Sequence, residues 1–84
     1  MDIKGKIMEC IALVLRVDLE KVKKLSGDQP LRLVGMDSLN CMDIIVNLEQ
    51  EFAVGFNDEE LLMDNINTID KLTKIIAQKT AVQD

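Results

Sequence analysis

Apolar residues recur every three or four positions in three long stretches, and this spacing predicts three long helices. The first is expected to run from about residue 2 to residue 15, with Asp2 as its N-cap. The second is expected from about Ser38 to residue 52 or 53. The third begins after Thr68, which reads as its N-cap, and residues 80–84 are expected to fray.

The connection over residues 16–37 has no long regular period, although residues 19–25 are consistent with a short helical turn. Ser26-Gly27-Asp28 and Pro30 interrupt that turn. A connection of this length is unusual in a small domain, and loops of this kind are often functional. Its apolar residues suggest that it packs against the rest of the protein.

The stretch after the second long helix predicts one short helix. Gly55 is expected to terminate the preceding helix, and Asn57 or Asp58 to cap the short one. Leu61 and Leu62 are expected to turn inward. The predicted fold is therefore all-α, a small antiparallel helical bundle of three long helices plus one short helix, with a long first loop. Residues 1–84 are expected to form a single domain.

The second long helix carries more apolar surface than one core face needs. With Ile44 at angle zero and about 100° per residue, a core face falls between about 0° and 100°. It contains Cys41, Ile44, Ile45, Leu48 and Phe52. A second apolar group, Leu39, Met42, Val46 and Ala53, falls between about 160° and 220°. Asp43, Glu49 and Gln50 border it.

Two interpretations of this second stripe stay open. An apolar patch with an acidic rim is typical of a protein interaction site. Alternatively, the long first loop covers the stripe and both faces are core. If the loop covers only part of the stripe, Met42 and Val46 are expected to be its most exposed residues.

Composition narrows the possible chemistry. The 84 residues contain no His, Trp or Tyr and only two Phe. A Ser-His-Asp triad, His general-base catalysis and a His zinc site are therefore excluded, and a base-stacking surface is not expected. The longest uninterrupted apolar run, residues 11–15, is far too short to span a membrane. No secretory signal is expected at the N-terminus.

The two cysteines, Cys10 and Cys41, are too few for a disulfide framework and are not spaced for a metal. Both fall on core faces of their predicted helices, so burial as small hydrophobic side chains is expected. Their number is consistent with a reducing, cytoplasmic setting.

The charge is strongly segregated along the chain. The net charge is −5, but residues 33–70 hold nine acids and no base. Such a segment disfavours nucleic acid as a partner and favours a basic protein surface. A solvated face that only keeps the protein soluble is the alternative.

The start of the second helix carries the candidate chemistry. Asp37 and Ser38 are both favourable N-caps, and Gly35 eases the turn, so an ordinary cap explains these residues. No base in the chain is evident that could make Ser38 a nucleophile. Modification of Ser38 by another enzyme is physically sensible, because a phosphate there would meet free N–H groups and the positive helix end.

Gly35-Met36-Asp37-Ser38-Leu39, followed by residues 44–52 (Ile-Ile-Val-Asn-Leu-Glu-Gln-Glu-Phe), resembles the acyl carrier protein family. The likeness extends to residues 17–22 and to Asn67-Thr68-Ile69, and covers nearly all of residues 3–77. The resemblance implies that Ser38 carries 4′-phosphopantetheine through a phosphodiester, flanked by Asp37 and Leu39. A separate magnesium-dependent phosphopantetheinyl transferase would install it from coenzyme A.

The resemblance also implies a docking surface for enzymes that load and process acyl thioesters. Its expected members are the apolar and acidic residues Leu39, Met42, Asp43, Val46, Glu49, Glu59, Glu60 and Asp64. Basic patches on the partner enzymes would meet these residues. The protein itself would be a monomeric carrier and not an enzyme, with no nucleic-acid or membrane partner.

Several residues depart from the fatty-acid carriers of this family. Asn40 and Gln50 stand where those carriers usually have acids, and Arg32-Leu33 replaces an acidic pair. The Gly-Met-Asp-Ser-Leu form is similar to carriers of polyketide and nonribosomal peptide pathways. The chain resembles a discrete carrier, and fatty acyl, polyketide, aminoacyl and D-alanyl cargo all stay open. A different function, as an acidic helical module that binds proteins without any prosthetic group, is the alternative. A third hypothesis, a small enzyme, is disfavoured because the chain has no His.

Overall fold

The structure is a computed structural model that describes residues 2–81. Three helices of 13 residues each dominate it: α1 (Ile3–Leu15), α3 (Asn40–Phe52) and α5 (Ile69–Ala81). The short elements are α2 (Leu19–Lys23), the 3₁₀ helix η1 (Leu31–Val34) and α4 (Met63–Ile66). The predicted all-α class and its three long helices are confirmed. Within residues 2–81, β-type pairing is limited to an isolated bridge between Pro30 and Thr68.

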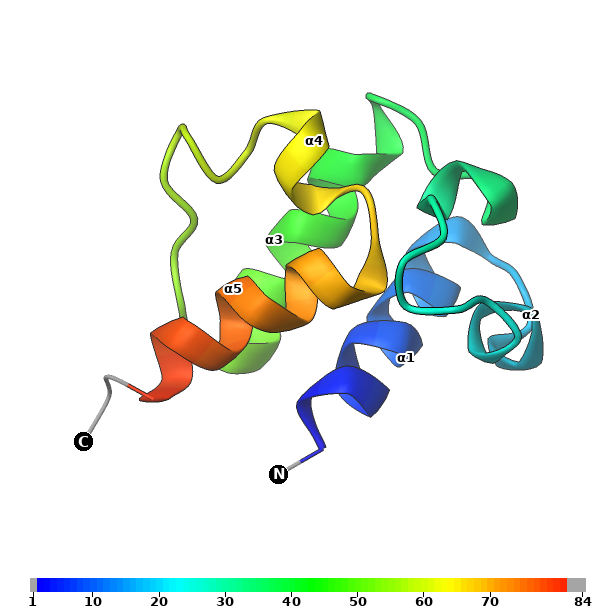
Figure 1. Cartoon of the computed structure of the whole chain (residues 1–84), viewed down its shortest axis with the longest axis horizontal. Coiled ribbons are helices and arrows are strands. Elements are labelled where there is room, and N and C mark those ends of the chain that lie inside the picture. The colour runs from blue at the N-terminus through cyan, green and yellow to red at the C-terminus, as the bar shows by residue number, and fades with distance from the viewer. Residues whose placement is uncertain (1, 82–84) are drawn as a thin grey trace.

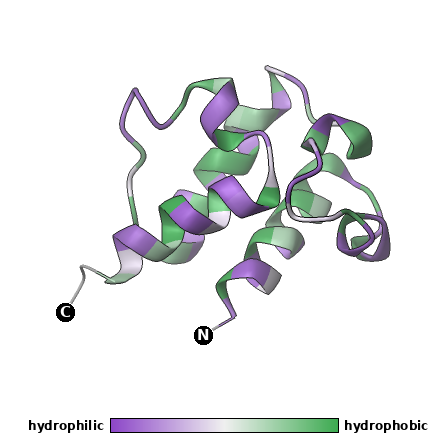
Figure 2. Ribbon diagram, in the orientation of Figure 1, coloured by the Kyte–Doolittle hydropathy of each residue, from purple (hydrophilic) through white to green (hydrophobic). Residues whose placement is uncertain are grey.

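The core lies where α1 packs against both α3 and α5 (Figure 1). Each long helix contributes an apolar stripe, and the ribbon coloured by hydropathy shows apolar and polar residues alternating along α5 (Figure 2). The largest fully buried side chains are Ile7, Ile11, Val22, Leu31, Ile44, Leu48, Ile66, Ile69, Leu72 and Ile76. They come from the three long helices, from α2 and α4, and from η1, so the short elements also belong to the core.

The caps of the first and last long helices are those expected. An Asp2 carboxylate oxygen accepts a hydrogen bond from the Gly5 N–H at 3.0 Å, and the Thr68 hydroxyl accepts one from the Lys71 N–H at 3.1 Å. The expectation that residues 80–84 fray is wrong for residues 80 and 81. The Thr80 hydroxyl donates to the Ile76 carbonyl at 2.9 Å and α5 continues to residue 81. Residues 82–84 lie outside the described part of the chain.

The end of α3 differs from the expectation. Ala53, not Gly55, adopts the left-handed conformation that ends the helix, with φ 55°, and its N–H bonds to the Glu49 carbonyl. A non-glycine residue at such a φ is strained. A hydrogen bond three residues beyond the strained position, from the Phe56 N–H to the Glu49 side chain, helps to hold the chain in this turn.

The long first loop is packed down, as its apolar residues suggested. Val22 and Leu31 are fully buried, and the Leu31 N–H donates to the Asn67 carbonyl at 2.8 Å. The chain also passes close to the start of α5 at Gly27, whose carbonyl accepts from the Asp70 N–H at 3.0 Å. A Cβ at Gly27 would collide with the Asp70 carboxylate, so any other residue here would force that side chain to move.

The short helix expected after Gly55 forms later than predicted. Residues 57–62 make successive i→i+3 hydrogen bonds and stay as turns, and the α-helical turn is α4, at residues 63–66. Leu61 is half-buried as expected, but Leu62 is 61% exposed, so its inward orientation was wrong. Leu62 has extended backbone (φ −64°, ψ 136°), which ends the run of turns before α4 begins.

No helix in residues 2–81 combines the length and the apolar character that a membrane crossing needs.

Candidate functional site

Ser38 lies in a tight turn that precedes α3, two residues before the helix begins. The prediction placed the helix start near Ser38, and in the structure α3 begins at Asn40, with Leu39 as its N-cap. One carboxylate oxygen of Asp37 accepts hydrogen bonds from the N–H groups of Leu39 and Asn40, both at 2.8 Å. The Asp37 carbonyl accepts the Cys41 N–H at 3.0 Å. Asp37 thus fixes the backbone on the C-terminal side of Ser38.

The N-terminal side of the turn is fixed by Gly35 and Asn40. Gly35 has φ 103°, a left-handed conformation that favours glycine. The Asn40 side chain reaches back across the turn: its oxygen accepts the Asp37 N–H at 2.7 Å and its amide nitrogen donates to the Gly35 carbonyl at 2.9 Å. Ser38 is therefore held between two reciprocally bonded residues.

The Ser38 side chain is exposed, and its hydroxyl makes no hydrogen bond within residues 2–81. This hydroxyl is accessible to a modifying protein, as attachment of a phosphodiester requires. The expectation of free N–H groups around a phosphate is wrong for Leu39 and Asn40, because the Asp37 carboxylate already occupies both. The amides of Leu39 and Asn40 are therefore not open to a free anion at this turn.

The second apolar stripe of α3 is exposed. Leu39 is 83% exposed, and Met42 and Val46 are 44% and 46% exposed. The long first loop therefore does not cover it, and the core alternative is wrong for these residues. The expectation that Met42 and Val46 would be the most exposed is also wrong, because Leu39, which lies just before α3, is more exposed than either.

The two acidic residues expected to rim this stripe differ in their surroundings. Asp43 is exposed and has no ion pair within residues 2–81. Glu49 is half-buried, and its carboxylate accepts the Phe56 N–H at 2.9 Å. Glu49 therefore secures the chain after α3, a structural role that spacing did not reveal.

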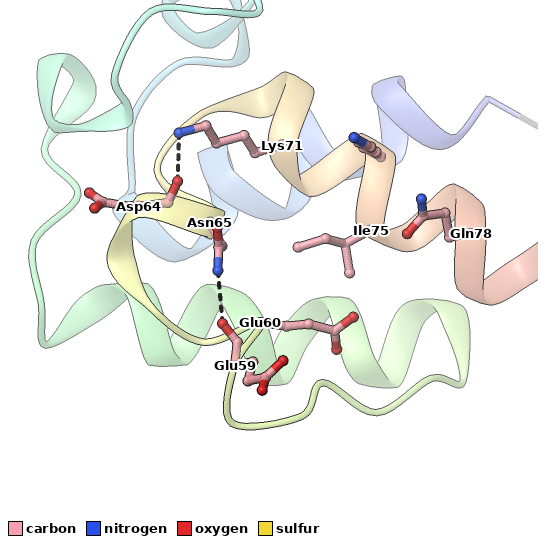
Figure 3. Close-up of a pocket in the computed structure, with 8 residues that line it drawn as sticks. Glu59, Glu60, Asp64, Asn65, Lys71, Ile75 and Gln78 are labelled. Atoms are coloured by element: carbon pink, nitrogen blue, oxygen red, sulfur yellow. Dashed lines mark hydrogen bonds between the residues drawn. The ribbon is translucent and has the colours of Figure 1, made fainter.

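The other three acidic candidates surround a cleft of about 430 Å³ between residues 59–65 and α5 (Figure 3). Glu60 pairs with Lys79 of α5 at 2.7 Å, and this hydrogen bond holds the pKa of the Glu60 carboxyl below its usual value. Glu59 and Asp64 are exposed. The structure thus places Glu59, Glu60 and Asp64 together, but Glu60 is already paired within the protein.

Backbone contacts hold the walls of this cleft together. The Lys71 ammonium donates to the Asp64 carbonyl at 2.5 Å, and the Asn65 amide donates to the Glu59 carbonyl at 2.8 Å (Figure 3). Lys79 also lies 5.6 Å from the centre of the Phe56 ring. Sequence reasoning missed Lys71 and Lys79, because no local spacing signals a contact between α5 and a preceding loop.

Both cysteines are free and buried, as predicted. Burial raises the pKa of the Cys41 thiol, whose sulfur lies 3.4 Å from the Ser38 carbonyl oxygen. Burial likewise raises the pKa of Cys10. Thiols in such surroundings are poor nucleophiles, which is consistent with a packing role.

The chain is similar to known proteins over most of its length. A family model described as a phosphopantetheine attachment site matches residues 5–76. An acyl carrier protein homolog from Mycoplasma genitalium is 49% identical over 35 residues, which is 42% of either chain. An acyl carrier protein from Buchnera aphidicola subsp. Schizaphis graminum is 28% identical over 93% of this chain and 94% of its own.

A solved structure is also similar in fold. The solution structure of a candidate acyl carrier protein from Anaplasma phagocytophilum superposes with a TM-score of 0.76. It is 30% identical, and the match covers 93% of this chain and 88% of the other.

Proposed function

Because this chain belongs to the acyl carrier protein family, whose members carry covalent 4′-phosphopantetheine, we propose that Ser38 bears that group and that the chain presents acyl thioesters to partner enzymes. The observation that carries the proposal is the exposed Ser38 hydroxyl, which makes no hydrogen bond to any described residue and lies in a fixed turn within the matched residues 5–76. Asp37 and Leu39 flank the attachment point. The carrier domain spans residues 1–84, and the protein acts as a cytoplasmic monomer.

The chemistry of attachment needs a second protein. The Ser38 oxygen forms a bond to the phosphorus next to the pantetheine of coenzyme A, the pyrophosphate bond breaks, and adenosine 3′,5′-bisphosphate leaves. The serine proton must pass to a base, and no His is present in this chain to accept it. A phosphopantetheinyl transferase with Mg²⁺ supplies that base and orients the coenzyme. The carrier contributes the hydroxyl and the fixed turn.

Partner enzymes dock on the exposed stripe of α3 with its acidic rim. Leu39, Met42 and Val46 supply apolar contact, and beside them the Asp43 carboxylate pairs with no base in the described part of the chain. Glu59 and Asp64 extend the negative surface. Glu49 and Glu60 are weaker docking groups, because a partner's base must compete with the Phe56 N–H and with Lys79.

The cargo is an acyl group on the thiol of the arm. The relatives are named acyl carrier proteins, which favours an acyl chain over an aminoacyl or D-alanyl group. Partner enzymes of fatty acid or polyketide synthesis, or of nonribosomal peptide synthesis, would then act on it. Mass spectrometry of the native loaded protein would identify the cargo.

The proposal is tested by loading the purified chain with coenzyme A, Mg²⁺ and a phosphopantetheinyl transferase. We expect the intact mass to increase by a single phosphopantetheine. Proteolytic mapping is expected to place it on the peptide that contains Ser38. A chain that is folded by circular dichroism and gains no mass with several transferases would instead be an unmodified interaction module.

A charge reversal at Asp43 tests the docking surface. In Asp43→Lys we expect kcat/KM for acyl transfer by a partner enzyme to fall by about tenfold at low salt, because a like charge would face the partner's basic patch. The difference should shrink as salt rises. Asp28→Lys, an equal reversal at an exposed loop residue, serves as control. Equal rates for the two variants would contradict docking at Asp43.

A further inference from the structure

The Asn40 side chain closes the turn that holds Ser38. Its oxygen accepts the Asp37 N–H at 2.7 Å, while its amide nitrogen donates to the Gly35 carbonyl at 2.9 Å. The Asn40 backbone N–H in turn donates to the Asp37 carboxylate at 2.8 Å. Asn40 therefore bonds to residues on the N-terminal side of Ser38 from a position on its C-terminal side.

The chemistry of this contact requires an amide. The exchange between Asp37 and Asn40 is a capping box, in which each side chain accepts the other's backbone N–H. An aspartate at position 40 could make that exchange, but an ionised carboxylate has no donor for the Gly35 carbonyl. The third bond, to Gly35, is thus available only to a side chain that both accepts and donates.

The hydrogen bond from Asn40 to Gly35 matters because of the backbone conformation of this glycine. Gly35 has φ 103°, and as glycine it has the freest backbone of the turn. The Gly35 N–H already bonds to the Arg32 carbonyl at the end of η1. The Asn40 amide restricts the glycine further, because it fixes the Gly35 carbonyl relative to the start of α3. The exposed Ser38 hydroxyl makes no hydrogen bond to the residues that the structure describes, and the backbone on both of its sides is held in place.

We propose that Asn40 is a positioning residue for the modification of Ser38: its carboxamide holds the Gly35–Asp37 backbone so that the hydroxyl is presented in one orientation to the transferase. This inference rests on the proposed function, because it concerns the same reaction. A fixed nucleophile lowers the entropy that must be lost at the transition state. The effect is therefore expected mainly in kcat.

The test compares modification rates of the wild type, Asn40→Ala, Asn40→Asp and the control Asn47→Asp. Asn47 lies on the same helix, is half-buried and makes no side-chain hydrogen bond within residues 2–81, so its variant adds the same charge without breaking the turn. The readouts are kcat and KM with coenzyme A and a transferase, amide hydrogen exchange at Asp37, and circular dichroism.

We expect kcat to fall roughly tenfold in Asn40→Ala and Asn40→Asp, with little change in KM. A fall of this size corresponds to the loss of about one hydrogen bond in the transition state. Asn47→Asp should match the wild type. The Asp37 amide should exchange faster in Asn40→Ala but stay protected in Asn40→Asp, whose carboxylate still accepts it.

The outcomes separate this inference from the proposed function. A wild type that is never modified overturns the proposed function and the inference with it. A wild type that is modified, with Asn40→Ala equally fast, overturns only the role of Asn40. A slower Asn40→Ala with unchanged exchange at Asp37 also overturns it, because Asn40 would then act by direct contact with the transferase.

Discussion

The variant Ser38→Ala is expected to gain no phosphopantetheine under conditions that load the wild type completely. The side chain is exposed and makes no hydrogen bond in the described chain, so the substitution removes the reacting oxygen without removing a stabilising contact. The loss should be total and not partial, because no other group can form the same phosphodiester at this position. Intact-mass spectrometry after incubation with coenzyme A, Mg²⁺ and a transferase measures it.

Ser26 provides the matched control for this experiment. It is the other of the two serines in the chain, and it is also exposed in a turn, between α2 and η1. Ser26→Ala is expected to load as fully as the wild type. Loading of Ser38→Ala to the wild-type mass would show that the attachment point has been assigned to the wrong residue. Circular dichroism should show the same helix content in all three proteins.

The largest expected loss of stability follows from shortening a side chain at the centre of the bundle. Ile11 of α1 is fully buried, at 0% exposure, where α1 meets α3 and α5. Ile11→Ala is expected to lower the free energy of unfolding by about 2–5 kcal/mol, from lost burial and from the cavity that remains. This is a large part of the roughly 5–15 kcal/mol typical of a single domain. Urea denaturation followed by circular dichroism measures it.

Leu13 on the same helix is the control for Ile11. It is 70% exposed, so Leu13→Ala removes apolar atoms that are already in water. Its effect on the free energy of unfolding is expected to stay within about 0.5 kcal/mol. Similar losses in the two variants would contradict the packing of α1 described above.

The long helices could be predicted from sequence, and so could the short helical turn at residues 19–25, which is α2 (Leu19–Lys23). The 3₁₀ helix η1 and the position of α4 could not. The apolar stripes of α1, α3 and α5 repeat over several turns, so the pattern is strong there. Residues 57–62 begin with a reciprocal pair that resembles a helix start, in which Asn57 and Glu60 each accept the other's N–H. The turns stop at Leu62, because a nucleus this short is not extended without further packing.

The position of Ser38 could be predicted, but the interactions around it could not. The resemblance to acyl carrier proteins identified Asp37-Ser38-Leu39 as the attachment segment. The structure adds that the Asp37 carboxylate accepts hydrogen bonds from the N–H groups of Leu39 and Asn40. The spacing from Asp37 to Asn40 fits a capping box and could have indicated the reciprocal bond. Nothing in the sequence indicated that Glu49 and Glu60, both expected to dock partners, are bonded within the protein, because those contacts join residues 7 and 19 positions apart.

The Asp37 carboxylate binds the backbone N–H groups of Leu39 and Asn40, and this affects which anions the start of α3 can bind. Inorganic phosphate, nucleotides and unreacted coenzyme A are all anions that an open helix N-terminus would bind without discrimination. At this turn the negative carboxylate already fills the positions that such anions would take. Small phosphates are therefore not expected to settle at the start of α3, and the exposed Ser38 side chain stays uncovered.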